Sequence, residues 1–290
     1  MIKIYSQKDA AGLLATRKTD SNKRDFGYVA LVGGSLKYSG AIRLSALSAA
    51  EAAQVSGAGV VTVAAPKEIC PLIIPQILCE TLMPLNEESF AETSRGRYVP
   101  LSEAFSKYDV ICFGMGIGRE PEVPRMLKDL LENFGGILVI DADGLWALTQ
   151  LDKSILKLSK ARIVLTPHYG EYKMLTAWND ALPLSERCIL LLKGPNPERG
   201  ETLITNGTTD ILVNTGTSGM SKGGSGDVLS GIIGAMAGQF GKKNLTEAVA
   251  LAAYINGLAG MNAAAENGVI SMTPKDTAME IKKVLSSLYA

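Results

Sequence analysis

The stretch Asn214-Thr-Gly-Thr-Ser-Gly-Met-Ser-Lys-Gly-Gly-Ser-Gly-Asp-Val-Leu-Ser-Gly231 is the most informative part of this 290-residue chain. Several glycines remove side chains from a short loop, and apolar residues then recur at helical spacing from Val228 to Met236. This pattern predicts a glycine-rich loop that runs into the start of a buried helix. Because a helix N-terminus presents unpaired N–H groups and the glycines let a phosphate approach the backbone closely, the pattern also predicts an anion site where the loop meets the helix.

Asp227 is the one acid in this stretch, and a carboxylate beside a phosphate site should repel the ligand. It makes chemical sense as a general base that takes the proton of a hydroxyl group attacking phosphorus. The alternative is that Asp227 only caps the helix, which aspartate does well. The loop alone does not decide between the two, but the rest of the chain favours the base.

Length and composition fit one domain, residues 1–290, with 47% hydrophobic residues and with 29 basic residues balancing 29 acidic ones. Without a basic surface, binding to nucleic acid or an acidic membrane is not expected. No signal peptide or membrane span is recognised, so a cytoplasmic protein is predicted. One histidine and scattered cysteines argue against a Cys/His zinc site and predict buried thiols in a reducing cytosol. The cysteines are Cys70, Cys79, Cys112 and Cys188.

Short apolar runs alternate with helical patterns along the chain. Strands that are apolar on both faces, interleaved with helices, predict a mostly parallel sheet covered on each side. An Asn206-Gly207 turn predicts a hairpin just before the glycine-rich loop. Strands are predicted at Tyr28–Val32, Val60–Ala64, Val110–Phe113, Ile137–Ile140, Arg162–Leu165, Ile189–Leu192, Thr202–Thr205 and Ile211–Val213. Helices are predicted at 40–56, Glu122–Asn133, Val228–Gly238, Leu245–Asn267 and from Pro274 onward.

Polar clusters follow the predicted strands, and ligands of open parallel sheets bind beyond the carboxyl ends of the strands. Asp141 can reach a magnesium ion through water, although no metal ligand is certain, and Asp143 is expected to cap the next helix. Glu171 can cap a helix after His168, and Lys193 can neutralise a nucleotide phosphate. Each cluster alone also fits an ordinary turn or cap. The clusters are Gly33–Ala41, Gly114–Gly118, Asp141–Gly144, Thr166–Glu171 and Lys193–Pro195.

Taken in order, these motifs resemble those of the ATP- or ADP-dependent NAD(P)H-hydrate dehydratases, from about Asn22 to near the C-terminus. The ordered set is specific, although each motif alone is modest. The motifs include Val32-Gly33-Gly34-Ser35, Tyr38-Ser39-Gly40-Ala41, Gly57-Ala58-Gly59, Gly114-Met115-Gly116-Ile117-Gly118, Asp141-Ala142-Asp143, Thr166-Pro167-His168, Leu192-Lys193-Gly194 and Gly223-Gly224-Ser225-Gly226-Asp227.

The resemblance implies a ribokinase-like three-layer α/β/α fold and a metabolite-repair reaction. In it, ATP or ADP with Mg²⁺ phosphorylates the ring hydroxyl of the S-epimer of NADHX or NADPHX. Phosphate then leaves and restores NADH or NADPH. Asp227 is implied as the base, and the amides around Gly224, Ser225 and Gly226 as the anion hole. Substrate positions are implied or expected at Tyr38, Ala41, Gly116, His168 and Asp227, and nucleotide positions at Lys193, Gly194, Thr202, Asn214 and Gly226.

The chain departs from the family pattern where 196–201 looks inserted before Thr202, and where Thr217-Ser218 replaces Asn-Pro. No room for a fused epimerase domain is seen before residue 25, so a separate NAD(P)HX epimerase is the expected functional partner, and a homo-oligomer is expected. Two alternatives are a kinase of a vitamin-precursor alcohol, such as hydroxymethylpyrimidine or hydroxyethylthiazole, and a nucleotide sensor. A sensor has no use for Asp227, and the Tyr38–Ala41 and Gly114–Gly118 clusters speak against the kinase.

Overall fold

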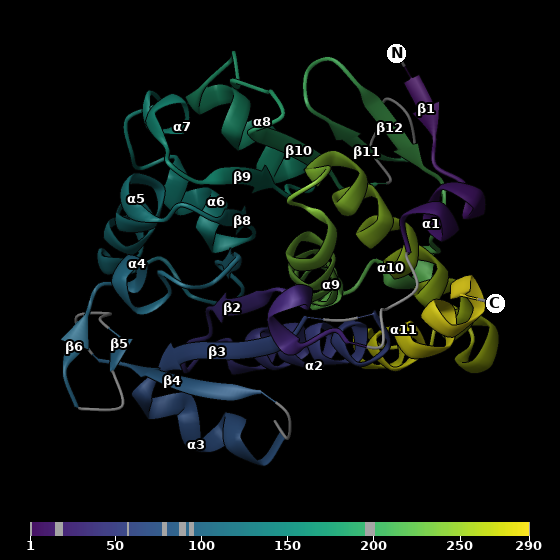
Figure 1. Ribbon diagram of the computed structural model, residues 1–290, viewed down its shortest axis with the longest axis horizontal. Helices are drawn as coiled ribbons and strands as arrows, with labels where there is room; N and C mark the ends of the chain where they lie inside the picture. Colours follow the sequence, from purple (N-terminus) through teal and green to yellow (C-terminus); the bar gives the residue numbers. More distant parts are fainter. Residues whose placement is uncertain are drawn as a thin grey trace.

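The computed structural model describes residues 2–14, 20–56, 58–76, 80–86, 91–92, 96–194 and 201–289 (Figure 1). The strands are β1 Ile2–Ile4, β2 Tyr28–Val32, β3 Val60–Pro66, β4 Thr81–Leu85, β5 Ala91–Glu92, β6 Tyr98–Val99, β7 Val110–Phe113, β8 Ile137–Ile140, β9 Arg162–Leu165, β10 Cys188–Leu192, β11 Thr202–Thr205 and β12 Asp210–Val213. The helices are α1 Gln7–Leu13, α2 Ser39–Ser56, α3 Cys70–Ile73, α4 Leu101–Ala104, α5 Glu122–Asn133, α6 Asp143–Leu148, α7 Ile155–Leu158, α8 Tyr169–Trp178, α9 Ser225–Phe240, α10 Leu245–Asn267 and α11 Pro274–Tyr289.

All of these strands join one sheet in the order β1-β12-β11-β10-β9-β8-β7-β2-β3-β4-β5-β6. From β10 to β4 every neighbouring pair is parallel, which confirms the predicted mostly parallel sheet. The predicted hairpin is β11–β12, paired antiparallel with Thr205 opposite Asp210. The chain leaves β2 toward β3 on one side and returns to β7 on the other, so the order reverses between β2 and β7. Open α/β sheets bind ligands at such a switch point.

The central strands bury both faces, because alternate residues point to opposite sides of the sheet. Val29 and Leu31 of β2 enter a core shared with α2, α9, α10 and α11. Ala30 and Val32 enter a second core with residues of α5 and α6. Figure 1 shows these helix groups on either side of the sheet. The three-layer α/β/α architecture is therefore confirmed.

Helix α9 lies very close to the middle of the sheet because glycines face the strands. A Cβ on Gly234 would stand 2.9 Å from both Cys112 Sγ of β7 and Val29 Cγ1 of β2, and a Cβ on Gly238 would be 3.5 Å from Val29. At these two glycines the helix therefore has no side chain of its own between its backbone and the side chains of β2 and β7. The backbone of α9 packs directly on β2 and β7, the two strands of the switch point. This contact fixes the position of the N-terminus of α9.

Helix α10 is the one helix among the described residues that is long and apolar enough to cross a membrane, and most of it is buried inside the protein. It packs against α9 and α11 as a core helix. Cys70, Cys112 and Cys188 are buried free thiols, as predicted, whereas Cys79 lies outside the described residues.

Candidate functional site

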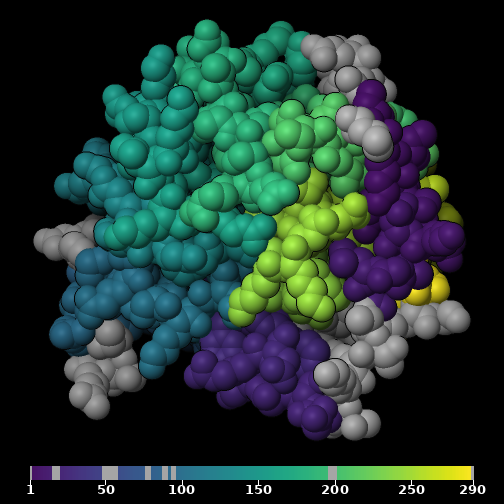
Figure 2. Space-filling model, turned by 45° about the horizontal axis from the view of Figure 1, so that its top comes forward, coloured from purple at the N-terminus to yellow at the C-terminus, as the bar shows by residue number. Residues whose placement is uncertain are grey.

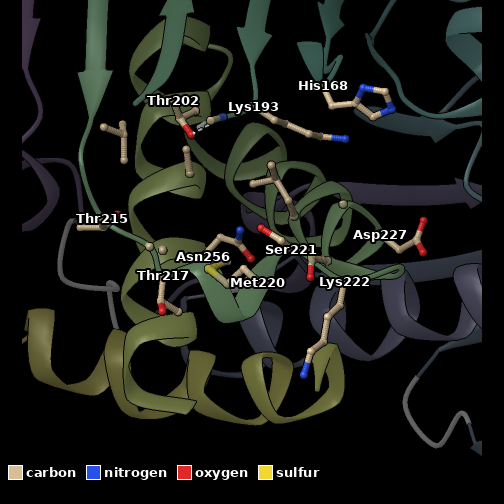
Figure 3. Close-up of a pocket in the computed structure, with 18 of the residues that line it drawn as sticks. His168, Lys193, Thr202, Thr215, Thr217, Met220, Ser221, Lys222, Asp227 and Asn256 are labelled. Atoms are coloured by element: carbon tan, nitrogen blue, oxygen red, sulfur yellow. Dashed lines mark hydrogen bonds between the residues drawn. The ribbon is translucent and has the colours of Figure 1, made fainter. Parts of the chain in front are cut away.

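A cleft of about 720 Å³ lies where the glycine-rich loop, the ends of β10 to β12 and helix α10 meet (Figure 3). All five predicted nucleotide positions line it: Lys193, Gly194, Thr202, Asn214 and Gly226. In Figure 3, Asp227 and His168 lie toward one end of the view, and Thr215 and Thr217 lie toward the other. The size suits a bound mononucleotide, since ligand clefts commonly measure about 300–1,000 Å³.

The start of α9 forms the anion-binding part of this cleft. Gly224 is the residue before the helix and has φ +102°, a conformation that favours glycine. A Cβ there would also stand 2.6 Å from Leu44 Cδ1. The Ser225 amide donates to Lys222 O, but the Gly226 and Asp227 amides have no acceptor in the described part of the chain. They are free to bind an anion in the cleft.

A buried ion pair lies beneath this helix start. Lys193 Nζ donates to Asp141 Oδ1 at 2.6 Å, and a Cβ on Gly226 would be 3.0 Å from the same Nζ. Asp141 is 1% exposed, and it also accepts hydrogen bonds from Thr166 Oγ1 at 2.8 Å and Ser230 Oγ at 2.6 Å. Burial alone lowers the pKa of Lys193, but the surrounding carboxylates outweigh it and raise the pKa above its ordinary value. Lys193 therefore remains charged next to the free amides.

Asp227 lies at the third position of α9 and is largely withdrawn from water. Burial raises the pKa of its carboxyl to about 7; the charge of Asp141 adds to the rise, Lys193 opposes it, and Asp143 adds a little more. The carbonyl of Asp227 accepts a hydrogen bond from Ser45 of α2 at 2.8 Å, which ties the helix start to α2. A carboxyl with a pKa near 7 has the property that a general base at neutral pH needs.

The predicted substrate positions Tyr38, Ala41 and Gly116 do not line the cleft but gather at the switch point. Gly116 has φ +64°, and a Cβ there would lie 2.7 Å from Tyr38 O and 2.8 Å from the Ala41 Cβ. The Gly34 amide donates to Met115 O at 2.8 Å, which joins the loops that follow β2 and β7. The structure thus brings these three residues together, beside the strands on which α9 rests.

His168 lines the cleft and caps helix α8. Its Nδ1 accepts hydrogen bonds from the Gly170 and Glu171 amides at 3.0 and 3.2 Å, and Glu171 accepts one from the His168 amide. The prediction that Glu171 helps to cap a helix is confirmed. Its Nε2 lies 3.6 Å from Glu171 Oε2, and the His168 side chain as a whole is 63% exposed. The role of His168 in substrate binding stays a prediction.

On the nucleotide side, Thr202 Oγ1 accepts a hydrogen bond from the Gly194 amide at 3.1 Å, as expected if Thr202 acts with the Lys-Gly segment. Residues 195–200, most of the suspected insertion, lie outside the described residues. The contact therefore joins the two ends of that segment.

The expectation for Asp143 was wrong. The residue before α6 is Ala142, with φ 48° and no side-chain cap, and Asp143 is already inside the helix. Its carboxylate instead accepts hydrogen bonds from the Gly118 amide at 3.2 Å and Arg119 Nε at 3.0 Å. The sequence gives no hint of this contact, because Gly118 and Asp143 meet only when the loops after β7 and β8 fold side by side.

No group of three or more His, Cys, Asp or Glu side chains suited to a metal ion occurs among the described residues. Asp141, the one candidate ligand, is engaged by Lys193, Thr166 and Ser230. These contacts agree with the alternative of a buried, hydrogen-bonded acid.

Sequence reasoning missed Ser230 and the orientation of Lys222. Ser230 is a buried polar residue on an otherwise apolar helix face, a signal that could have paired it with an acid beneath. Lys222 lies in a glycine-rich loop, where lysines often bind phosphate. Here its Nζ points away from Lys193 and donates to Ile270 O at 2.6 Å and Met272 O at 2.5 Å (Figure 3). It ties the loop to the turn between α10 and α11.

Comparison with known proteins bears on the same region. A family model described as NAD(P)H-hydrate dehydratase matches residues 29–283. The chain is 34% identical over 295 residues to the bifunctional NAD(P)H-hydrate repair enzyme of Pyrobaculum aerophilum, covering 97% of this chain and 55% of that protein. It is 28% identical over 288 residues to the ADP-dependent (S)-NAD(P)H-hydrate dehydratase of Streptococcus pneumoniae, covering 94% and 91%. This chain thus spans about half the length of the bifunctional relatives it matches.

Solved structures show the same fold. A ribokinase-like superfamily protein of Enterococcus faecalis superimposes with a TM-score of 0.80 at 23% identity, covering 99% of this chain and 96% of that one. The ADP/ATP-dependent NAD(P)H-hydrate dehydratase of Bacillus subtilis, co-crystallised with ATP and Mg²⁺, gives a TM-score of 0.77 at 21% identity and covers 99% and 98%. The ribokinase-like fold expected from the resemblance is confirmed.

Proposed function

This chain belongs to the NAD(P)H-hydrate dehydratase family, and we propose that it uses ATP or ADP to dehydrate the S-epimers of NADHX and NADPHX. The observation that carries the proposal is the start of α9. The first turn of this helix holds two unpaired amides and the Asp227 carboxyl, whose pKa is about 7. The charged Lys193 lies directly beneath that turn. This combination suits transfer of a phosphoryl group to a hydroxyl group that must lose its proton.

In the first step, the oxygen of the ring hydroxyl attacks the terminal phosphorus of the nucleotide. Its proton goes to the Asp227 carboxylate, the new P–O bond forms, and the bond to the departing nucleotide breaks. The Gly226 and Asp227 amides bind the oxygens of the transferring group, on which negative charge is concentrated. Lys193 stands beside them and neutralises further charge, because Asp141 holds its Nζ beneath Gly226.

In the second step, the C–O bond of the ring breaks and phosphate leaves with the bonding electrons. A proton is lost from the neighbouring ring carbon, and the double bond of the dihydronicotinamide is restored. Phosphorylation is needed because hydroxide is a poor leaving group. Magnesium, when bound to the nucleotide, neutralises phosphate charge; the protein residues position the groups that react.

We propose that the hydrated ring lies at the switch point, next to Tyr38, Ala41 and Gly116. These residues border the strands on which α9 rests, while the nucleotide occupies the cleft on the far side of the helix start. Asp227 lines the cleft, and its carbonyl is bonded to Ser45 of α2, the helix that also carries Ala41, so we propose that it serves both regions. His168, whose side chain is 63% exposed, is proposed to contact the substrate from the end of β9.

The direct test is recovery of the absorbance of reduced nicotinamide after mixing the protein with NADHX or NADPHX, Mg²⁺ and either ATP or ADP. We expect recovery that requires the nucleotide, and the more effective nucleotide identifies the phosphoryl donor. No recovery with either nucleotide, using folded protein and the verified S-epimer, would contradict the proposal. A screen of vitamin-precursor alcohols would then test the kinase alternative, in which the phosphoester is the stable product.

Three further expectations remain predictions. They are a homo-oligomeric state, a cytoplasmic location and cooperation with an NAD(P)HX epimerase that supplies the S-epimer. Adding a purified epimerase to an equilibrated mixture of both epimers should raise the yield of NADH from partial to complete.

A further inference from the structure

Arg119 is held in a defined position directly after the Gly114–Gly118 loop. Its Nε donates to Asp143 Oδ1 at 3.0 Å, and its guanidinium carbon lies 5.6 Å from the centroid of the Trp146 ring. The same carboxylate accepts the Gly118 amide at 3.2 Å. The head group is therefore fixed by a charged hydrogen bond and by an aromatic face, an arrangement that arginine suits better than lysine.

The fixed guanidinium still has donors to offer. Only Nε is used by Asp143, and the described part of the chain provides no acceptor for Nη1 or Nη2. The Arg119 side chain is 62% exposed, whereas that of Asp143 is 19% exposed. The Arg119 guanidinium therefore lies at the surface with two donor nitrogens unused, while the carboxylate of Asp143 that balances its charge is more buried.

Arg119 is also near the proposed reaction centre. Gly116, three residues earlier, contacts Tyr38 and Ala41 at the switch point. Asp143, the partner of Arg119, is close enough to Asp227 to contribute to its raised pKa. In Figure 2 the segment that follows β2, in purple, lies next to the blue-to-teal segments that carry this loop on one face of the molecule.

We propose that Arg119 binds a phosphate group of the hydrated dinucleotide and so selects dinucleotide over smaller hydroxylated rings. The inference rests on the proposed function. A dinucleotide that places its ring beside Gly116 must lay its phosphates across the surface near the switch point. Lys193 lines the nucleotide cleft, where it is proposed to neutralise the phosphates of the nucleotide instead. Arg119 offers the two parallel donors that recognise a phosphate.

The test compares Arg119→Gln with the matched control Arg125→Gln. Arg125 is also an exposed arginine paired with one carboxylate, that of Glu122, but it lies on α5. We expect Arg119→Gln to raise the KM for NADHX about tenfold, the effect of losing one charged hydrogen-bonding partner. The kcat and the KM for ATP or ADP should stay within twofold, and Arg125→Gln should behave as the parent protein.

The two dinucleotides distinguish which phosphate is bound. An equal rise in KM for NADHX and NADPHX assigns Arg119 to the pyrophosphate that both contain. A rise for NADPHX alone assigns it to the 2′-phosphate. An unchanged KM for both would overturn the proposal.

Direct binding separates this inference from the proposed reaction, because titration of NADPH by its fluorescence requires no turnover. Tight binding by the parent protein without dehydration would remove the proposed function and still test Arg119. The variant Arg119→Lys keeps the charge and should recover much of the affinity at low salt. A loss equal to that of Arg119→Gln, together with a lowered Tm, would mean that Arg119 only supports the loop and would overturn the proposal.

Discussion

Replacing Asp227 by Asn should stabilise the folded protein above neutral pH while removing its proposed activity. In the folded protein the pKa of this carboxyl is about 7, against an ordinary value of 3.8. The folded state therefore holds a proton between these two pH values that the unfolded state has already lost. The contribution of this carboxyl to the unfolding free energy is therefore largest below pH 3.8, and it is lost as the pH rises through 7.

The size of the effect follows from the same shift. Each pH unit between the two pKa values removes about 1.4 kcal/mol, so the ionised carboxylate costs the folded state up to about 4 kcal/mol above pH 7. Asp227 is not completely shielded from water, which reduces the expected cost to about 2–4 kcal/mol. Asparagine has nearly the same shape and no charge, so it avoids this cost.

The assay is urea or thermal unfolding of both proteins at pH 5, 6, 7 and 8. The advantage of Asp227→Asn should grow by about 2–3 kcal/mol from pH 5 to pH 8, or roughly 3–5 °C in Tm for a chain of this size. Asp180→Asn, at an exposed position, is the control and should show no such trend. A stability difference that does not change with pH would refute the assigned burial. The kcat of the parent should fall as the pH drops below 7, because the base becomes protonated.

Substitutions at three other positions test the site. Gly226→Val places a side chain against Lys193 Nζ, 3.0 Å from the Cβ position, and should weaken nucleotide binding at least tenfold in calorimetry; unchanged affinity would place the phosphate elsewhere. Gly116→Ala must adopt φ +64° and meet Tyr38 O at 2.7 Å, so we expect a loss of about 2 kcal/mol in unfolding free energy and weaker substrate binding, with nucleotide affinity retained. Lys222→Met frees the glycine-rich loop from Ile270 O and should lower kcat severalfold with little change in Tm, whereas Lys222→Arg should restore part of it; equal kcat in all three proteins would contradict a positioning role.

The central fold was predictable because buried parallel strands leave a plain signal in the sequence. Tyr28–Val32, Val110–Phe113 and Ile137–Ile140 were predicted to the residue, since each is a short apolar run that ends in glycine or acid. The edges were not predicted. Strand β1 has only three residues, and β4 contains Pro84, which normally argues against a strand. Such strands form because a neighbouring strand supplies backbone hydrogen-bond partners, and the local sequence does not reveal that neighbour.

The site shows the same division. The glycine-rich loop was recognised because its backbone conformation requires glycine at particular positions, such as Gly224 with φ +102°. The contacts made by Asp143 and Lys222 were missed because the partners of Asp143 lie 24 and 25 residues away and those of Lys222 lie 48 and 50 residues away. Contacts over such distances depend on which loops the topology places side by side, and single-residue preferences say nothing about that.

The direct seating of α9 on the sheet has a consequence for substitutions far from the reaction. Asp227 and Gly234 are about 10 Å apart along the helix axis, and Gly234 has Cys112 and Val29 immediately beneath it. A bulkier residue at either strand position has no yielding side chain to absorb it and would lift or tilt the whole helix. The N-terminus of the helix would then move, and the Gly226 and Asp227 amides and the Asp227 carboxyl would move away from the groups they are proposed to bind. Inactivating changes in this protein should therefore include conservative ones in the centre of the sheet, at residues that no ligand touches.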